Sequence, residues 1–270
     1  MFEIAIISDE IALDIREAIQ HGLEMGIKKY EIRCLGSYEK RIPFVDEQDL
    51  DFLSDQVESG EIEITAISPG SFKILPSEKD QVKFHLQEML PQTFELARRF
   101  HTDKVITFSF MKDKVDESFV VETIKEVGTK AAEYGLTIAV ENEPGFYCDS
   151  GEATKRIIDK IHLDNVKINW DPGNAAGGGD VAYPTGYEFV KSDIVNMHVK
   201  DAVAYPELEC RLLNDGSVNW LGQLDALYHD NILPYITLET HYLPMLESTQ
   251  EDLRRLRILL ETVEKMNAQS

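Results

Sequence analysis

The chain has 270 residues, of which 43% are hydrophobic and 28% are charged, so it carries enough apolar material for one full core and is neither disordered nor fibrous. Its 27 Lys and Arg residues against 49 Asp and Glu residues give a formal net charge of −22. This balance excludes binding of nucleic acid or an anionic membrane through a broad basic surface, but not a small anionic ligand held by a few local cations.

The sequence shows no sign of membrane insertion, secretion or disulfide bonding. No apolar run approaches the ~20 residues that a membrane helix needs. The first ten residues contain acids and no basic residue, which does not fit a signal peptide. Three scattered cysteines, Cys34, Cys148 and Cys210, lack CxxC spacing. We therefore expect a cytoplasmic protein with reduced thiols.

Eight short runs rich in Ile and Val alternate along the chain with longer helical patterns. The runs do not alternate cleanly between apolar and polar residues, which is typical of strands that are buried on both faces. The predicted strands are residues 2–8, 28–33, 62–68, 104–109, 136–142, 166–171, 194–200 and 234–239.

The intervening segments have helical periodicity, and glycines follow several of them. Apolar stripes over residues 11–23 and 120–131 predict helices that bury one face. Gly26 and Gly135 follow these stripes directly, and Gly60 has the same place before the third strand. This pattern of helix, glycine and strand is typical of the αβ connections in a parallel sheet.

Two further signals concern helix ends. The residues Ser248 and Glu251 form a capping box, which predicts that the last helix begins there. Pro91 lies inside a long helical pattern over residues 77–100 and predicts a kink or break.

Eight strands that alternate with helical segments in a chain of this length favour a (β/α)₈ TIM barrel, formed as a single domain over residues 1–270. The main alternative is a doubly wound open sheet. It is disfavoured because residues 8–13, after the first strand, contain no glycine for a dinucleotide-binding turn.

Acidic or imidazole side chains stand at the ends of the last four predicted strands. Such positions face the active site of a barrel. Each residue alone has a structural interpretation, such as a turn aspartate or a core histidine. Together, three carboxylates and one imidazole would repel one another unless a cation neutralised them. Oxygen ligands with one nitrogen suit Mn²⁺, Mg²⁺ or Co²⁺, with Zn²⁺ as the alternative. The four residues are Glu141, Asp171, His198 and Glu239.

Motifs around these positions resemble a known family. The most specific are ENEPG at 141–145, WDPGN at 170–174 and HVKD at 198–201, and weaker matches include YEIR at 30–33 and SPGSFK at 68–73. In this order they resemble the xylose-isomerase-like TIM-barrel family of sugar and sugar-phosphate isomerases and epimerases. The resemblance runs from residue 8 to residue 242 and is weak for any one substrate.

The resemblance implies a function and roles for these residues. The family's metal ligands correspond to Glu141, Asp171, His198 and Glu239. In the ketose 3-epimerase branch the two glutamates also exchange protons with the substrate, which gives Glu141 and Glu239 catalytic roles. We therefore expect isomerisation or epimerisation of a sugar, sugar phosphate or related keto-polyol, by proton abstraction next to a carbonyl through a metal-stabilised enediolate.

Polar and charged residues in the loops after the strands are candidate substrate contacts. Cations beside the metal could hold a phosphate or a carboxylate. At position 174 the family often has a histidine, whereas Asn174 can hydrogen-bond but cannot act as a general acid; His241 could compensate. The candidate contacts are Glu10, Arg33, Lys73, Asn174, Lys200, Arg211 and His241.

Three other functions stay open at this point. A keto-sugar dehydratase similar to inosose dehydratase would use the same first proton transfer and then expel a hydroxyl. A non-catalytic sugar-binding barrel would not need Glu141 and Glu239. An apurinic endonuclease of the same superfamily would need further histidine ligands where Ser68, Ser109 and Asn174 stand. The expected partner is a small carbohydrate, without nucleic acid or membrane, and the sequence is compatible with a homo-oligomer.

Overall fold

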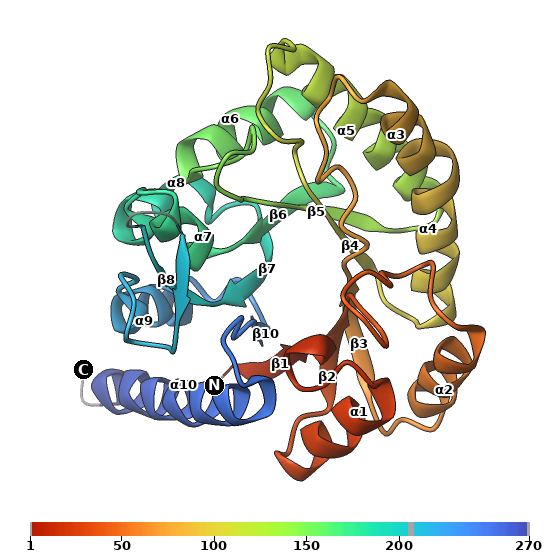
Figure 1. Cartoon of the computed structure of the whole chain (residues 1–270). Coiled ribbons are helices and arrows are strands. Elements are labelled where there is room, and N and C mark those ends of the chain that lie inside the picture. Colours follow the sequence, from red (N-terminus) through yellow and green to blue (C-terminus); the bar gives the residue numbers. More distant parts are fainter. Residues whose placement is uncertain (1, 205–207, 269–270) are drawn as a thin grey trace.

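The computed structural model describes residues 2–204 and 208–268, in which eight parallel strands close into a barrel surrounded by helices (Figure 1). Around the barrel the strands follow the order β1-β10-β7-β6-β5-β4-β3-β2. This confirms the predicted (β/α)₈ barrel. The barrel strands are β1 (Glu3–Ile7), β2 (Lys29–Ile32), β3 (Glu63–Ile67), β4 (Lys104–Thr107), β5 (Thr137–Glu141), β6 (Val166–Trp170), β7 (Ile194–Val199) and β10 (Tyr235–Leu238).

Helices follow the strands and pack on the outside of the barrel. Among them, no described helix is both long and apolar enough to cross a membrane. The helices are η1 (Ser8–Glu10), α1 (Ile15–Glu24), α2 (Glu47–Glu58), α3 (Lys79–Phe84), η2 (His85–Met89), α4 (Leu90–Arg99), α5 (Glu117–Glu133), α6 (Gly151–Ile161), α7 (Pro172–Gly177), η3 (Ala182–Gly186), α8 (Tyr187–Val190), α9 (Trp220–Asp230) and α10 (Met245–Asn267).

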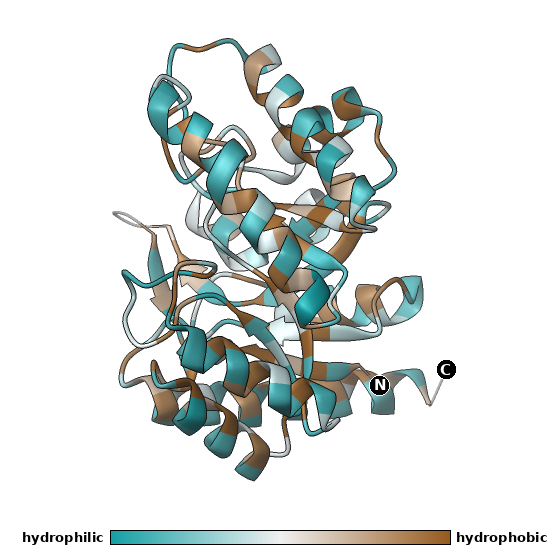
Figure 2. Ribbon diagram, turned by 90° about the vertical axis from the view of Figure 1, so that its right-hand side faces the viewer, coloured by the Kyte–Doolittle hydropathy of each residue, from teal (hydrophilic) through white to brown (hydrophobic). Residues whose placement is uncertain are grey.

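Every barrel strand lies inside one of the eight predicted runs. Burial on both faces explains why these runs are almost uniformly apolar: in β5, Ile138, Ala139 and Val140 are all fully buried. Figure 2 shows the same division, with hydrophobic central strands and helices that carry hydrophilic bands toward solvent. The core therefore lies between the strand exteriors and the inner faces of the helices.

Three of the helices end as predicted, with a glycine in the left-handed region of backbone conformation. Gly26, Gly60 and Gly135 follow α1, α2 and α5 with φ angles of 78°, 71° and 72°. A side chain at such a φ angle strains the backbone, whereas glycine adopts it freely. One or two residues separate each glycine from the strand that follows it.

The other two helix predictions have different outcomes. The break near Pro91 is confirmed, because the chain passes through the π-helical turn η2 between α3 and α4, just before the proline. The predicted start of α10 at Ser248 is wrong. The helix begins at Met245, directly after Pro244, and the Ser248 N–H already donates a helical hydrogen bond of 3.0 Å to the Pro244 carbonyl.

A small antiparallel hairpin, β8 (Asp201–Val203) with β9 (Glu209–Arg211), follows β7. The buried carboxylate of Asp201 organises the chain after it. Its Oδ2 atom accepts the N–H groups of Asn214 at 2.8 Å and Gly216 at 3.2 Å, and its Oδ1 atom accepts that of Val218 at 3.1 Å. These bonds fix the backbone immediately after Lys200.

We predict that Gly135→Ala lowers the free energy of unfolding by about 1–2 kcal/mol, because an L-residue in the left-handed region costs about that much. An ideal Cβ at Gly135 would meet no atom within 4 Å, so the loss would come from the backbone alone. Urea unfolding measures the effect. Gly135→Asn is the matched control and should lose less, since asparagine tolerates this region better. Equal losses for both variants would contradict the prediction.

Candidate metal centre

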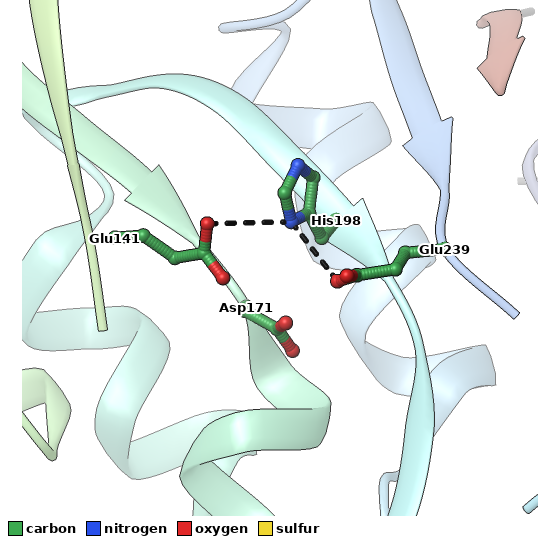
Figure 3. Close-up of side chains that lie close together, drawn as sticks. All are labelled: Glu141, Asp171, His198 and Glu239. Atoms are coloured by element: carbon green, nitrogen blue, oxygen red, sulfur yellow. Dashed lines mark ion pairs between the residues drawn. The ribbon is translucent and has the colours of Figure 1, made fainter. Parts of the chain in front are cut away.

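Four side chains converge at the carboxyl ends of neighbouring barrel strands (Figure 3). Glu141 is the last residue of β5, Asp171 follows β6, His198 lies near the end of β7 and Glu239 follows β10. Each offers one ligand atom, and these atoms all lie within 4.8 Å of one another. All four side chains are buried. The structure thus brings together the residues that the sequence suggested as metal ligands.

The histidine lies between the two glutamates. His198 Nδ1 is 3.2 Å from Glu239 Oε2 and 3.7 Å from Glu141 Oε2. In Figure 3 the two carboxylates point toward the same space from opposite sides, with Asp171 below them. Asp171 Oδ2 is buried and accepts no hydrogen bond of normal geometry, although Lys200 Nζ lies 2.6 Å away as an ion pair. A buried carboxylate oxygen with free lone pairs fits a divalent cation.

Two hydrogen bonds from the side chain of Asn142, just after the end of the neighbouring strand β5, hold the backbone of Asp171 in place. Asn142 Oδ1 accepts the Asp171 N–H at 2.8 Å, and Asn142 Nδ2 donates to the Asp171 carbonyl at 2.9 Å. Asp171 Oδ1 accepts the Asn174 N–H at 2.8 Å and so caps α7. The turn interpretation and the ligand interpretation of Asp171 are therefore compatible, since one oxygen caps the helix and the other faces the cluster.

A layer of buried polar side chains lies inside the barrel in contact with the cluster. Glu31, on β2, is fully buried, and its Oε2 atom lies 2.9 Å from His198 Nε2. Asn196 Nδ2 donates to the same Oε2 at 3.3 Å and to Asn169 Oδ1 at 3.0 Å. Asn169 Nδ2 in turn donates to Glu141 Oε2 at 3.1 Å. The ring and one glutamate of the cluster are thus oriented from within the barrel.

Two buried cations neutralise part of the acidic charge. Arg33 donates to Asp9 Oδ2 at 2.9 Å, to Glu10 Oε1 at 2.7 Å and to Glu239 Oε1 at 2.6 Å. Lys200 Nζ lies 2.9 Å from Glu239 Oε2, in addition to its ion pair with Asp171. Glu239 therefore has a cation on each oxygen, whereas Glu141 accepts two amide donors and pairs with His198 only at the longer distance of 3.7 Å.

The pKa values of the cluster follow from burial and these pairs. Burial raises the pKa of Asp171 to about 6, even with Lys200 beside it. Burial acts against ionisation of Glu239 too, but Lys200 and His198 hold its pKa well below the ordinary value. Burial lowers the pKa of His198, yet the surrounding Glu31, Glu141 and Glu239 carboxylates outweigh it and raise that pKa well above 6.5. The site thus attracts positive charge.

The count of buried charges leads to the same conclusion. Six buried carboxylates belong to the cluster and to the ion pairs and hydrogen bonds around it, against two permanently charged cations, Arg33 and Lys200. The excess of negative charge would be reduced by a divalent ion, which also supplies the ligand bonds that buried carboxylates require. The six are Asp9, Glu10, Glu31, Glu141, Asp171 and Glu239.

A cavity of about 290 Å³ opens above the cluster. This is close to the lower end of the usual range for small-molecule sites. Its wall includes Glu141, His198 and Glu239, together with four cations: Arg33, Arg41, Lys73 and Lys200. A larger cavity of about 460 Å³ lies at the opposite ends of β1 and β2, where no described group of metal-ligand residues is found.

The remaining substrate candidates have different positions. Lys73 lines the cavity, pairs with Glu143 at 2.6 Å and lies 4.1 Å from the centre of the Phe108 ring. Asn174 and His241 also line it, and Asn174 Nδ2 donates to Glu141 Oε1 at 3.2 Å.

Two candidates lie outside the described cavity wall. Glu10 holds Arg33 and His241, whose Nδ1 is 2.9 Å away, and this bond and the Arg33 charge keep the pKa of Glu10 at about 2 against the effect of burial. Arg211 pairs with Glu209 on the hairpin.

Neither Glu31 nor Arg41 was predicted from the sequence to be a site residue. A signal for Glu31 was present, because a charged residue inside an apolar strand, two positions before Arg33, must face the same side of the sheet as Arg33. Arg41 lies in the segment between β2 and α2, where no sequence pattern places it at the cavity.

We predict that the protein binds one divalent metal ion per chain and that His198→Ala weakens this binding at least 10-fold without unfolding the protein. Removing one ligand leaves the barrel layers intact. Elemental analysis and titration with Co²⁺ measure stoichiometry and affinity, and circular dichroism checks the fold. His229→Ala, at an exposed position on α9, is the control. Equal affinity in both variants would remove His198 from the ligand set.

We also predict that Glu31→Gln weakens metal affinity about 10- to 100-fold, because a carboxylate that accepts the second ring N–H fixes the orientation and tautomer of a ligating histidine. The Co²⁺ absorption spectrum should shift as well, since the ring can then rotate. Glu63→Gln, at the exposed start of β3, should change neither quantity. An unaltered spectrum and affinity in Glu31→Gln would show that this contact does not orient the ligand.

Comparison with known proteins places these features in a wider group. An uncharacterized protein of Methanocaldococcus jannaschii is 22% identical over 262 residues, which cover 90% of this chain and 83% of that protein. Among solved structures, a D-tagatose 3-epimerase-like protein superposes with a TM-score of 0.82 at 18% identity, over 98% of this chain and 99% of the other.

Two further solved structures share the fold. The probable 3-DHS dehydratase AsbF of Bacillus anthracis has a TM-score of 0.77 at 17% identity and covers 95% of this chain and 99% of its own. The IOLI protein with a bound zinc atom has a TM-score of 0.79 at 15% identity, with coverage of 97% and 98%. Residues 19–259 match the sequence family described as xylose isomerase-like TIM barrel. The chain belongs to the xylose isomerase-like TIM-barrel family.

Proposed function

We propose that this protein is a divalent-metal-dependent isomerase or epimerase of a sugar, sugar phosphate or related keto-polyol. The observation that carries the proposal is the pair of buried carboxylates, Glu141 and Glu239, which face one space from opposite sides beside His198 and Asp171 (Figure 3). This arrangement supports proton transfer on either face of a small molecule held between them. The family and the epimerase-like structural neighbours are consistent with it.

The metal is assigned to Glu141, Asp171, His198 and Glu239, whose oxygen-rich set suits Mn²⁺, Mg²⁺ or Co²⁺ and also accepts Zn²⁺. When bound, a divalent ion would polarise a carbonyl and stabilise the negative charge that develops on proton removal. The zinc reported for the IOLI protein supports a metal in this fold.

The two glutamates have different surroundings, which suggests an order for the proton transfers. Glu141 accepts hydrogen bonds from the neutral amides of Asn169 and Asn174 at 3.1 and 3.2 Å. Glu239 is held by Arg33 and Lys200, and two cations stabilise its ionised form. Glu141 is therefore the more basic carboxylate and the better candidate to remove the first proton. Glu239 then faces the other side of the reacting carbon and exchanges the second proton.

The cavity fits a small polyhydroxylated carbonyl compound. Asn174, Lys200 and His241 line it near the cluster and offer donors for hydroxyl oxygens. Lys73 lies farther along the wall, beside Glu143. A dehydratase shares the first proton transfer, so the reaction products decide between the two: epimerisation or isomerisation keeps every hydroxyl, whereas dehydration releases one as water.

We predict that metal-loaded protein, incubated in D₂O with a panel of ketoses and keto-sugars, catalyses the exchange of a carbon-bound proton of one of them for solvent deuterium. NMR measures the exchange rate. At least one of the variants Glu141→Gln and Glu239→Gln, and both in an epimerase, should reduce the exchange rate by at least ~10²-fold, because the amide keeps an oxygen ligand but removes the base. Glu95→Gln, exposed on α4, is the control.

The losses of exchange rate in the two single variants distinguish epimerisation from isomerisation or dehydration. Severe losses in both indicate epimerisation with one base on each face, whereas one mild variant indicates an isomerase or dehydratase with a single base. A double variant that still binds metal and still exchanges deuterium at a near-normal rate would overturn the carboxylate-pair mechanism. A protein that binds sugar without any exchange would be a non-catalytic sugar-binding barrel.

A further inference from the structure

The wall of the cavity contains an arginine side chain that has no partner. Arg41 lines the cavity together with Glu141, His198 and Glu239. Its Nη1 atom is buried and makes no hydrogen bond. Within residues 2–204 and 208–268, no hydrogen bond or ion pair involves this guanidinium. Arg41 as a whole is half-buried, but its buried Nη1 atom has no acceptor, and a buried charged donor without an acceptor is unfavourable.

The other three cations of the cavity wall are all paired. Arg33 binds three carboxylates, Lys200 binds two and Lys73 binds Glu143. Among the four cations that line the cavity, Arg41 alone pairs with none of the described acidic residues. The other cations of the wall each pair with a carboxylate of the protein, and Arg41 has no such carboxylate. The space beside Arg41 is the cavity.

The surroundings of Arg41 keep its side chain in place. The backbone is paired with the end of β2, because Arg41 forms a bridge with Cys34 and the Ile42 N–H donates to the Arg33 carbonyl at 3.0 Å. The guanidinium packs against Gly70, where an ideal Cβ would lie only 2.8 Å from Nη1. Any larger residue at Gly70 would displace the guanidinium, so the loop after β3 leaves the space that it occupies.

We propose that Arg41 is the anion-binding residue of the substrate site, and that the substrate therefore carries an oxyanion, either phosphate or carboxylate. The planar guanidinium can donate two parallel hydrogen bonds to either group. This inference rests on the proposed function, because it assigns the anion to the molecule that the metal centre acts on. It narrows the substrate class to sugar phosphates and sugar acids.

Calorimetric titration of the protein, with and without Mn²⁺, tests this assignment. The ligands are D-fructose, D-fructose 6-phosphate and D-fructuronate, a neutral sugar with its phosphorylated and its carboxylated counterpart. In the wild type, at least one anionic ligand should bind 10-fold or more tightly than fructose. Arg41→Gln should lower this preference by about 10- to 100-fold, in line with one charged hydrogen-bond pair. The anionic ligand that binds more tightly relative to fructose shows whether the substrate carries a phosphate or a carboxylate.

Two further variants control the experiment. Arg41→Lys should restore part of the preference, because it keeps the charge but loses the two-pronged geometry. Arg254→Gln, on the exposed face of α10, should leave the preference unchanged. Circular dichroism establishes that each variant is folded.

The anion-binding experiment can succeed or fail independently of the deuterium-exchange experiment, because ligand binding does not require turnover. Loss of anion preference in Arg41→Gln supports the inference even if no ligand exchanges deuterium, in which case only the proposed reaction fails. No anion preference in the wild type, or an undiminished preference in Arg41→Gln, overturns the inference, even if deuterium exchange occurs with a neutral sugar.

Discussion

Burial of like charge at one end of the barrel is the constraint on which the rest of the site depends. Carboxylates from β2, β5, β6, β10 and the turn after β1 lie together with almost no exposed surface. Isolated carboxylates in such a position would take up protons rather than stay ionised. They are held instead by Arg33 and Lys200, by amide donors from Asn169 and Asn174, and by the histidine between the glutamates. Polar side chains inside the barrel, Asn169 and Asn196 among them, add hydrogen bonds that hold these carboxylates in place.

Asymmetry within this cluster matters as much as its total charge. Glu239 has a cation on each oxygen, whereas Glu141 accepts two uncharged amide donors and shares only the His198 ring, 3.7 Å away. Two residues of the same type at equivalent strand ends thus acquire different affinities for a proton. The difference comes from β2 and β7 on one side and from β6 and α7 on the other, so it is a property of the assembled barrel rather than of either glutamate.

Much of this arrangement was predictable from the sequence, for a physical reason. Strands buried on both faces must be apolar runs, and the first polar residue after such a run stands at the barrel mouth, which located Glu141, Asp171 and Glu239. Arg41 was not predictable, because its position depends on how a loop packs against Gly70. The start of α10 was predicted three residues too late. The capping-box pattern at Ser248 suggested that start, whereas the helix begins directly after Pro244, a residue that is tolerated at the beginning of a helix but not in its interior.

The contact between α10 and the first loop has a consequence for how the molecule is made. Thr249 Oγ1 donates to the Glu10 carbonyl across 239 residues, the Arg33–Glu239 pair spans 206, and β1 pairs with β10. These contacts cannot form until residues 235–249 have left the ribosome, so the N-terminal strands wait for most of this sequence to be made. Until then β1 has an unpaired edge, and the acidic residues of the N-terminal half lack β10, the strand that completes the barrel beside them. Contacts of such long range also slow folding, which prolongs the time for which the unpaired edge of β1 is exposed to aggregation.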